Sequence, residues 1–229
     1  MRKISILFAL LFSATFLVAQ TSTPPPADNS VSMANLKGLL RLQLTITPSW
    51  MITGSSGNNS GSISSGRTNI YLHGTAEYYF TERFSMRGDG YYFLTKDKAH
   101  DTLGGLKHNH SLQVGASWHL RKGMRLDPYI GLCGGISLVQ IYPYNVSRVD
   151  GLTWNYMAPA HIEPVWAPRV GINFFGERVF HFFVEAQYLM GSYRPPVGPI
   201  LSLNELRVSA GLGFNFVILH KEATVRQNI

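Results

Sequence analysis

Side chains that can take part in acid–base or nucleophilic chemistry gather near the middle of the chain, at His100, Asp101, His108, His110 and Ser111. A histidine, a carboxylate and a hydroxyl form a nucleophilic site only when they meet at hydrogen-bond distance. Consecutive residues of a strand point to opposite faces, so a strand through His110 and Ser111 would separate these two side chains. We therefore expect a solvated loop and its adjoining strand here, and no enzyme.

Two histidines at alternate positions, His108 and His110, would share one strand face and could hold a metal ion there. The pair lacks a cysteine or close carboxylate, so the sequence predicts no metal site. The single cysteine, Cys133, is interpreted as a small packing residue. No phosphate-binding loop or dinucleotide fingerprint occurs, and we expect no cofactor.

The elements that carry these residues belong to a chain of unusual composition. Of its 229 residues, 45% are hydrophobic and only 14% are charged, against about 25% charged in a typical soluble domain. One cysteine rules out an internal disulfide. The net charge of +7 is not gathered into clusters of Lys and Arg, so we expect no nucleic-acid partner.

The N-terminus has the pattern of a secretory signal peptide. Arg2 and Lys3 precede an apolar run over residues 4–18, and the small residue Ala19 follows it. The apolar run is short for a membrane anchor. We expect a cleaved signal peptide over 1–19, a periplasmic linker over the Pro- and Ser-rich residues 20–35, a body over 36–218, and a C-terminal tail over 219–229.

Apolar and polar residues alternate throughout the body, with the apolar ones at even-numbered positions. Every even position from Leu206 to Ile218 is apolar, and so is every even position from Leu112 to Leu120. This period of two predicts strands with one apolar and one polar face. The pattern gives eight strands, over 37–52, 67–80, 83–96, 109–121, 127–142, 160–175, 179–193 and 202–218.

These strands are long, and their connections alternate in length. They average about 15 residues, whereas a strand needs about 9–11 to cross a bilayer. Short connections are expected at 81–83, 122–126 and 176–178, and longer ones at 53–66, 97–108, 143–159 and 194–201. Short periplasmic turns and long outer loops are typical of bacterial transmembrane barrels. The sequence predicts an all-β fold, an eight-stranded antiparallel up-and-down transmembrane β-barrel in the outer membrane.

An uncharged stretch, residues 129–147, has the length of a transmembrane helix. It contains several glycines, Gln140, Pro143 and Asn145, and its apolar residues keep the two-residue period. We therefore expect no transmembrane helix there.

Aromatic residues distinguish a membrane barrel from a soluble, lipocalin-like one. Transmembrane barrels carry aromatic rings at both membrane interfaces, on the face turned to lipid. The apolar face here has Phe80, Phe84, Trp118, Phe174 and Phe180 at the short-turn ends of strands, and Trp50, Tyr92, Tyr142 and Trp166 toward the long loops. A soluble barrel would instead need a charged outer face.

The polar face carries charges that we expect to pair in the lumen. If the first short turn is centred on Glu82, Glu77 lies opposite Arg87; if the third is centred on Glu177, Arg169 lies opposite Glu185. Buried charges must be paired, and an eight-stranded barrel is filled by its own side chains. We predict a packed lumen network of Arg41, Glu77, Arg87, Asp89, Arg169, Glu185, Glu205 and Arg207. His73, His119, His161, His181 and Cys133 are expected on the same inward face.

With this pattern in place, the chain resembles the small eight-stranded outer-membrane β-barrels of the OmpA transmembrane-domain and OmpX type. The resemblance covers residues 36–218 and rests on architecture. It implies an integral protein of a Gram-negative cell envelope. The precursor ending Val18-Ala19-Gln20 resembles those of Bacteroidetes-type proteins. The chain departs from the family in continuing past its last aromatic alternation, Phe214 and Phe216, to Ile229.

Four functions follow as hypotheses. The first is a non-enzymatic structural or protein-interaction role in the envelope, and the second is an accessory subunit of an outer-membrane secretion or assembly complex. A small pore and a lipid-modifying enzyme are the others. The expected partners are outer-membrane lipid or lipopolysaccharide and other envelope proteins. Near the outer rim, Lys96, Lys98, Lys107 and Arg67 are candidates for contact with lipid A phosphates.

Overall fold

The computed structural model describes residues 36–52, 68–95, 106–120, 125–147, 153–156, 159–176, 179–194 and 200–217. The expected signal peptide, linker and tail lie outside these ranges. Within the described residues, no helix has the length and apolar character needed to span a bilayer.

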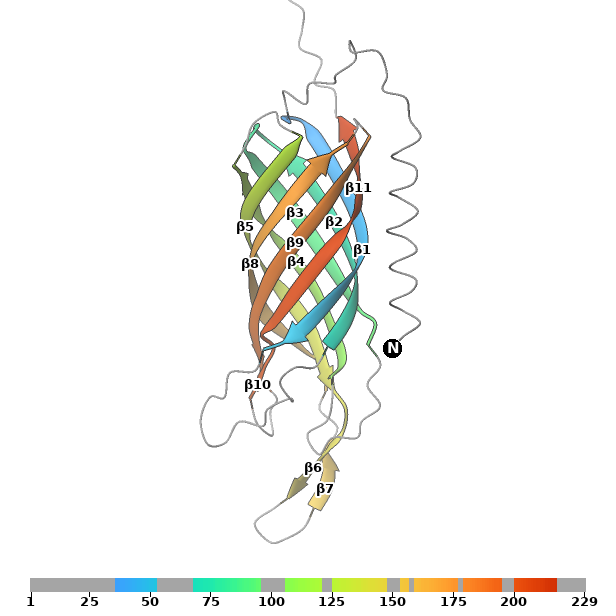
Figure 1. Cartoon of the computed structure of the whole chain (residues 1–229). Coiled ribbons are helices and arrows are strands. Elements are labelled where there is room, and N and C mark those ends of the chain that lie inside the picture. Colours follow the sequence, from blue (N-terminus) through green and yellow to red (C-terminus); the bar gives the residue numbers. More distant parts are fainter. Residues whose placement is uncertain are drawn as a thin grey trace, which may run out of the picture. The chain divides into compact units, whose positions relative to one another are not determined.

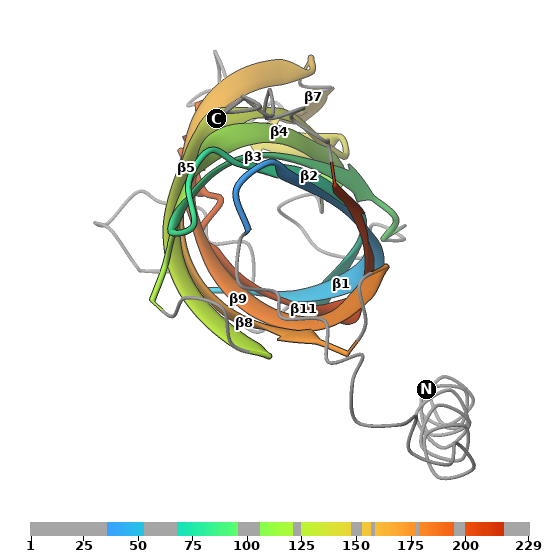
Figure 2. The same ribbon diagram turned by 90° about the horizontal axis from the view of Figure 1, so that it is seen from above.

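Eight long antiparallel strands form a closed wall. They are β1 (Leu39–Met51), β2 (Thr68–Tyr79), β3 (Phe84–Phe93), β4 (Leu106–His119), β5 (Leu126–Ile141), β8 (His161–Phe175), β9 (Phe180–Tyr193) and β11 (Glu205–Val217). Strands adjacent in this series pair with each other, and β11 pairs with β1 to close the ring (Figure 2). The predicted eight-stranded antiparallel β-barrel is confirmed.

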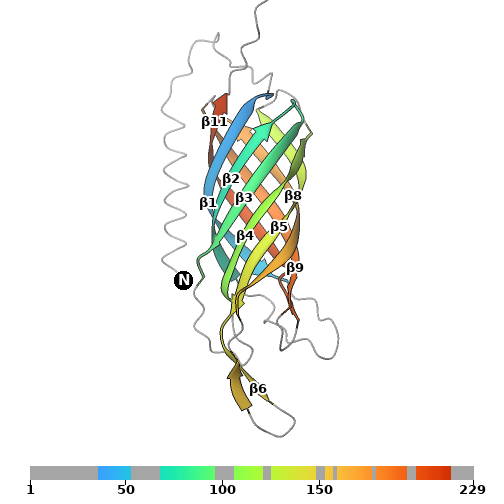
Figure 3. The same cartoon turned by 180° about the vertical axis from the view of Figure 1, so that it is seen from behind.

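Three short strands were not expected. β6 (Tyr144–Ser147) and β7 (Thr153–Tyr156) form a hairpin inside the predicted loop 143–159, and β10 (Leu201–Ser202) pairs with β9. The hairpin keeps the register of the strands below it, because Val139 pairs with His161 and Tyr144 with Tyr156. β6 and β7 therefore prolong the β5–β8 ladder beyond the barrel wall (Figures 1 and 3). The uncharged stretch 129–147 belongs to β5 as far as Ile141 and to β6 from Tyr144, so the preference for strand over a transmembrane helix is confirmed there.

The side chains of the wall follow the predicted alternation. Odd-numbered residues are buried inside, and large apolar residues at even positions are exposed outside, for example Leu44 (67% exposed), Ile162 (65%) and Leu112 (64%). A water-soluble protein rarely exposes so large a continuous apolar surface. Apolar side chains outside and polar side chains inside are the arrangement expected of a barrel whose outer face contacts lipid acyl chains.

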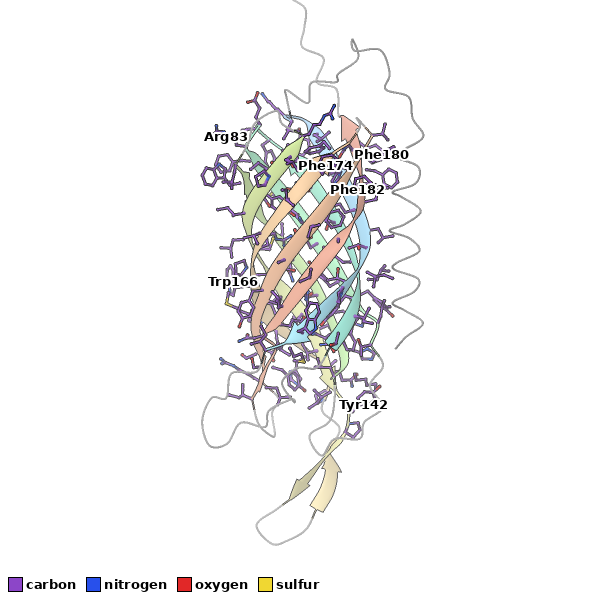
Figure 4. The ribbon with its side chains drawn as sticks, viewed as in Figure 1. Arg83, Tyr142, Trp166, Phe174, Phe180 and Phe182 are labelled. Atoms are coloured by element: carbon purple, nitrogen blue, oxygen red, sulfur yellow. The ribbon has the colours of Figure 1, made fainter. Side chains whose placement is uncertain are left out.

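Two aromatic belts ring this apolar surface. Phe84, Trp118 and Phe174 are exposed at the end with the short turns, and Trp50, Tyr92 and Trp166 are exposed toward the long loops. Figure 4 shows Phe174, Phe180 and Phe182 near one end of the wall and Trp166 nearer the other. The belts lie where the sequence predicts them.

Apolar clusters occupy both ends of the interior. At the long-loop end the cluster consists of Met51, Tyr71, Tyr91, Phe93, Leu106, Val139, Ile141, Tyr193, Leu201 and Leu203. At the short-turn end it consists of Leu36, Leu39, Tyr79 and Phe175. The polar part of the lumen lies between these two apolar lids.

Candidate functional site

The polar interior contains all eight residues of the predicted lumen network, and each is at most 2% exposed. The structure brings them together in three groups along the barrel. All of them occupy inward positions on the strands of the wall. The interior of an eight-stranded barrel is just wide enough for its side chains to fill, so inward side chains of different strands meet.

The group nearest the short turns centres on Glu77. Arg41 and Glu77 are register partners on β1 and β2, and their side chains form an ion pair. The Glu77 carboxylate also accepts a hydrogen bond from Ser85 and lies 3.4 Å from Nε2 of His119. Nδ1 of His119 is 2.8 Å from Oδ2 of Asp127. His119 thus bridges two buried carboxylates.

The central group is a quartet of two arginines and two carboxylates. Arg87 lies 2.8 Å from Asp89 through Nε and 2.6 Å from Glu185 through one terminal nitrogen. Arg169 lies 2.8 Å from Asp89 and 3.5 Å from Glu185. The Tyr129 hydroxyl donates a 2.6 Å hydrogen bond to Glu185. Each carboxylate is therefore shared by both arginines.

The group toward the long loops centres on Arg207 and Glu205, which form an ion pair on β11. The Arg207 guanidinium contacts the faces of two aromatic rings, 4.4 Å from the centroid of Tyr71 and 4.2 Å from that of Tyr91. The Tyr71 hydroxyl donates to Glu205 at 3.0 Å, and Ser49 donates to the same carboxylate at 2.8 Å. Cation–π contacts of this kind strengthen when water is excluded.

The three groups are linked through His119. Together they contain four arginines, Arg41, Arg87, Arg169 and Arg207, and five carboxylates, Glu77, Asp89, Asp127, Glu185 and Glu205. The ring nitrogens of His119 lie within 3.4 Å of Glu77 and 2.8 Å of Asp127, so the carboxylate in excess over the arginines has a partner as well. An unpaired buried charge costs several kcal/mol, so these pairings are what allow the charged groups to be buried.

The first predicted cross-strand pair is confirmed in register, because Glu77 lies opposite Arg87. The ion pair of Glu77 is nevertheless formed with Arg41 on its other side. The second predicted pair is wrong: Arg169 lies opposite Gln187, and Glu185 lies opposite Gly171. The last pair before the turn is Phe175 with His181. The turn is therefore centred on residue 178 instead of 177, which moves every partner by two positions.

Sequence reasoning missed several members of the interior. Asp127 and the three tyrosines Tyr71, Tyr91 and Tyr129 all contact the charged groups named above. Each is at an odd-numbered position of a predicted strand. The alternation of the two faces therefore already indicated that these four side chains point inward. His73 and Cys133 face inward as expected: His73 Nε2 lies 3.0 Å from Asp89, and Arg169 donates to the Cys133 sulfur.

Among the residues that suggested hydrolytic chemistry, His110 and Ser111 are described, and they lie on opposite faces of β4. Ser111 is buried inside, where its hydroxyl accepts a 3.0 Å hydrogen bond from Arg207. His110 lies on the outer face, where its ring stacks on Tyr92 at 4.5 Å between centroids. His100 and Asp101 lie outside the described residues. Within the described ranges, no three His, Cys, Asp or Glu side chains gather in a way that could hold a metal ion.

Of the four candidates for lipid A contact, the structure describes Lys107, which is exposed at the start of β4. Lys96, Lys98 and Arg67 lie outside the described residues. The β4–β5 ladder has a register shift between Leu106 and His108, a β-bulge that contains Lys107.

No protein-family model matches the chain, and neither does any curated protein. Solved structures do match. Neisserial surface protein A superposes with a TM-score of 0.52 at 11% identity, over 79% of this chain and 98% of that one. OprG of Pseudomonas aeruginosa (TM-score 0.49, 14% identity) covers 79% of this chain and 96% of its own. The N-terminal β-barrel domain of P. aeruginosa OprF (0.47, 12%) covers 79% and 98%. The chain shares the closed eight-stranded antiparallel barrel fold with Neisserial surface protein A.

Proposed function

We propose that the chain is an integral outer-membrane β-barrel protein of a Gram-negative envelope, exported through a signal peptide cleaved after Ala19. One observation carries this: the large apolar residues lie outside and the ionised ones inside. Such a molecule is stable only with hydrocarbon around it. The resemblance of fold to Neisserial surface protein A supports the same placement.

The proposed orientation puts the short turns and both ends of the barrel domain in the periplasm. The long loops and the β6–β7 hairpin then face the outside of the cell (Figure 3). The hairpin extends past the wall without a third strand beside it among the described residues. Two isolated strands are marginally stable in water, so a hairpin of this kind suits contact with another molecule.

The role we propose is therefore non-enzymatic, through envelope structure or protein contacts at the outer surface. The buried ion pairs and the two apolar lids of the lumen support a plugged barrel over a pore. An accessory subunit of a larger outer-membrane assembly is the second candidate, and the projecting hairpin favours it as a docking element. The separation of His110 from Ser111 argues against a lipid-modifying enzyme.

Cysteine labelling in intact cells tests the placement. Asn145→Cys on β6 should react with a membrane-impermeant maleimide from outside, whereas Arg83→Cys in a short turn should react only after lysis. The native Cys133 is buried and provides the background. Labelling of Arg83→Cys in intact cells, or absence of both variants from the outer-membrane fraction, would overturn the proposal.

Partner contact is tested separately. A variant with residues 144–156 replaced by a short Gly-Ser linker should still insert, since β5 and β8 remain paired without the hairpin. In vivo cross-linking followed by mass spectrometry should then identify fewer cross-linked proteins for this variant than for the intact protein. An unchanged set of cross-linked proteins would show that the β6–β7 hairpin is not the site of protein contact.

A further inference from the structure

A β-bulge at the start of β4 changes the face on which two residues lie. Leu106 is paired with Ile141 and His108 with Gln140, so Lys107 is the extra residue. Leu106 is buried in the apolar lid, while Lys107 is exposed. Bulges commonly redirect side chains in this way. Without the bulge, the odd-numbered Lys107 would point into the lumen, where its ammonium would meet the apolar lid.

The bulge turns Lys107 to the outer face, where the next outward residues of β4 are His108 and His110. The rings of His108 and His110 are 5.5 Å apart, and His110 stacks on Tyr92 at 4.5 Å. Tyr92 is 58% exposed. One ammonium group and two imidazoles thus lie within four consecutive positions of β4, on the outer face of the wall.

One hydrogen bond fixes which nitrogen of His110 carries its proton. The backbone N–H of Phe93 donates to Nδ1 of His110 at 3.1 Å. Neutral imidazole has one lone pair and one N–H, so Nε2 carries the hydrogen and is a donor. A metal ligand needs a lone pair on the binding nitrogen. His110 is therefore unsuited to bind a metal through Nε2 and suited to donate to an anion.

The level of this cluster in the barrel matches the interface of the bilayer. Eight residues separate His110 from Trp118 on β4, Tyr92 from Phe84 on β3, and Trp166 from Phe174 on β8. His110 is therefore level with the outer aromatic belt, which Trp166 marks in Figure 4. Eight residues span about 26 Å along a strand, or roughly 20 Å across the membrane at the usual tilt. The lipid headgroups therefore begin at the level of His110.

We propose that Lys107, His108 and His110 form a binding site for the phosphate of an anionic lipid in the outer leaflet, with Tyr92 as its floor. This rests on the proposed outer-membrane placement and names the lipid contact on β3 and β4. The Lys107 ammonium and the His110 Nε2–H donate to the phosphate, and Leu112 (64% exposed) continues the surface toward the acyl chains. The apolar continuation favours a lipid over a free phosphate ion.

Native mass spectrometry of the full chain, released from nanodiscs, tests the proposal. The nanodiscs contain equal amounts of phosphatidylcholine and purified lipid A. The intact protein should retain one lipid A molecule in preference to phosphatidylcholine. Lys107→Gln should weaken that preference about fivefold, the effect of one cationic side chain at an anionic surface. Lys107→Arg should restore it. The matched control is Arg125→Gln, an exposed charge removed at the opposite end.

Two outcomes overturn the site: equal loss in Lys107→Gln and Arg125→Gln, or no loss in either. Displacement of lipid A by inorganic phosphate at equal concentration would show an ion site instead of a lipid site. Long-range proton–nitrogen NMR of the refolded protein checks the tautomer independently, and a hydrogen on Nδ1 of His110 would contradict the argument. None of these results depends on the cell-labelling experiment, so failure of the site and failure of the membrane placement are distinguishable.

Discussion

Removal of the Glu185 carboxylate should cost the barrel a large part of its stability. In the intact quartet, Glu185 and Asp89 offset the charges of Arg87 and Arg169. Glu185→Ala leaves two buried guanidinium groups sharing one carboxylate, and it removes the acceptor of the Tyr129 hydroxyl. Breaking a buried pair by removing one partner costs about 3–5 kcal/mol. We expect a loss in that range.

The measurement is equilibrium unfolding by urea in phospholipid vesicles, followed by the fluorescence of the outward-facing tryptophans. A double-mutant cycle with Arg87→Ala isolates the pair. Because the single variants each leave a charge unpaired, the double variant should be more stable than the sum of the two losses predicts, by about 1–3 kcal/mol. Glu185→Gln keeps the shape and the Tyr129 acceptor, so it should lose less than Glu185→Ala.

Arg83→Ala is the matched control, since Arg83 is an exposed arginine in a short turn (Figure 4). It should change the free energy of unfolding by less than about 0.5 kcal/mol. If Glu185→Ala also falls in that small range, or if the losses in the cycle simply add, the lumen is hydrated and the reasoning about buried charge is refuted.

Further predictions concern the rest of the wall. Glu77→Ala should cost about 3 kcal/mol in the same unfolding assay, because it strands Arg41; a neutral result would mean that His119 and Asp127 rearrange to compensate. Gly115→Ala should reduce the folded fraction on a heat-modifiability gel, since its Cβ would lie 2.2 Å from the Leu132 carbonyl oxygen, whereas Gly88→Ala meets nothing within 4 Å and should fold normally. Equal folding of these two would show that the wall is looser than described. Val170→Arg on the exposed outer face should lower the free energy of unfolding from vesicles by about 2–4 kcal/mol, and a neutral effect would argue against lipid at that position. The purified barrel should give no stable conductance steps in a planar bilayer, because both lids and the ion pairs fill the lumen; a reproducible step would show an open path.

Much of the fold follows from the period of two in the sequence. Alternation is a local property, since each side chain's face depends only on its parity along an extended backbone. This is why the sequence predicts the eight strands, the aromatic belts and the inward position of residues such as Glu77 and Arg169. The β6–β7 hairpin was missed because a loop was expected over 143–159, although Tyr144 and Trp154 continue the even-numbered aromatic series.

The partners of the charged residues were harder to predict. Register depends on the number of residues in each turn, and an error of one residue in the centre of the turn after β8 moved Arg169 from Glu185 to Gln187. The partner of Glu77 lies across the β1–β2 ladder. The long loop between those strands has several possible turns among its Gly, Ser and Asn residues, so the register could not be counted from one centre.

The sequence by itself determined that this chain forms a barrel with apolar side chains outside and polar ones inside. Apolar and polar residues alternate along each strand, and this alternation assigns every side chain to one face of the wall. Only the tertiary structure decided which charges share a carboxylate and that Lys107 points outward. The physical reason is that an ion pair depends on distances between strands, and a single inserted residue in a ladder reverses the face of its neighbours.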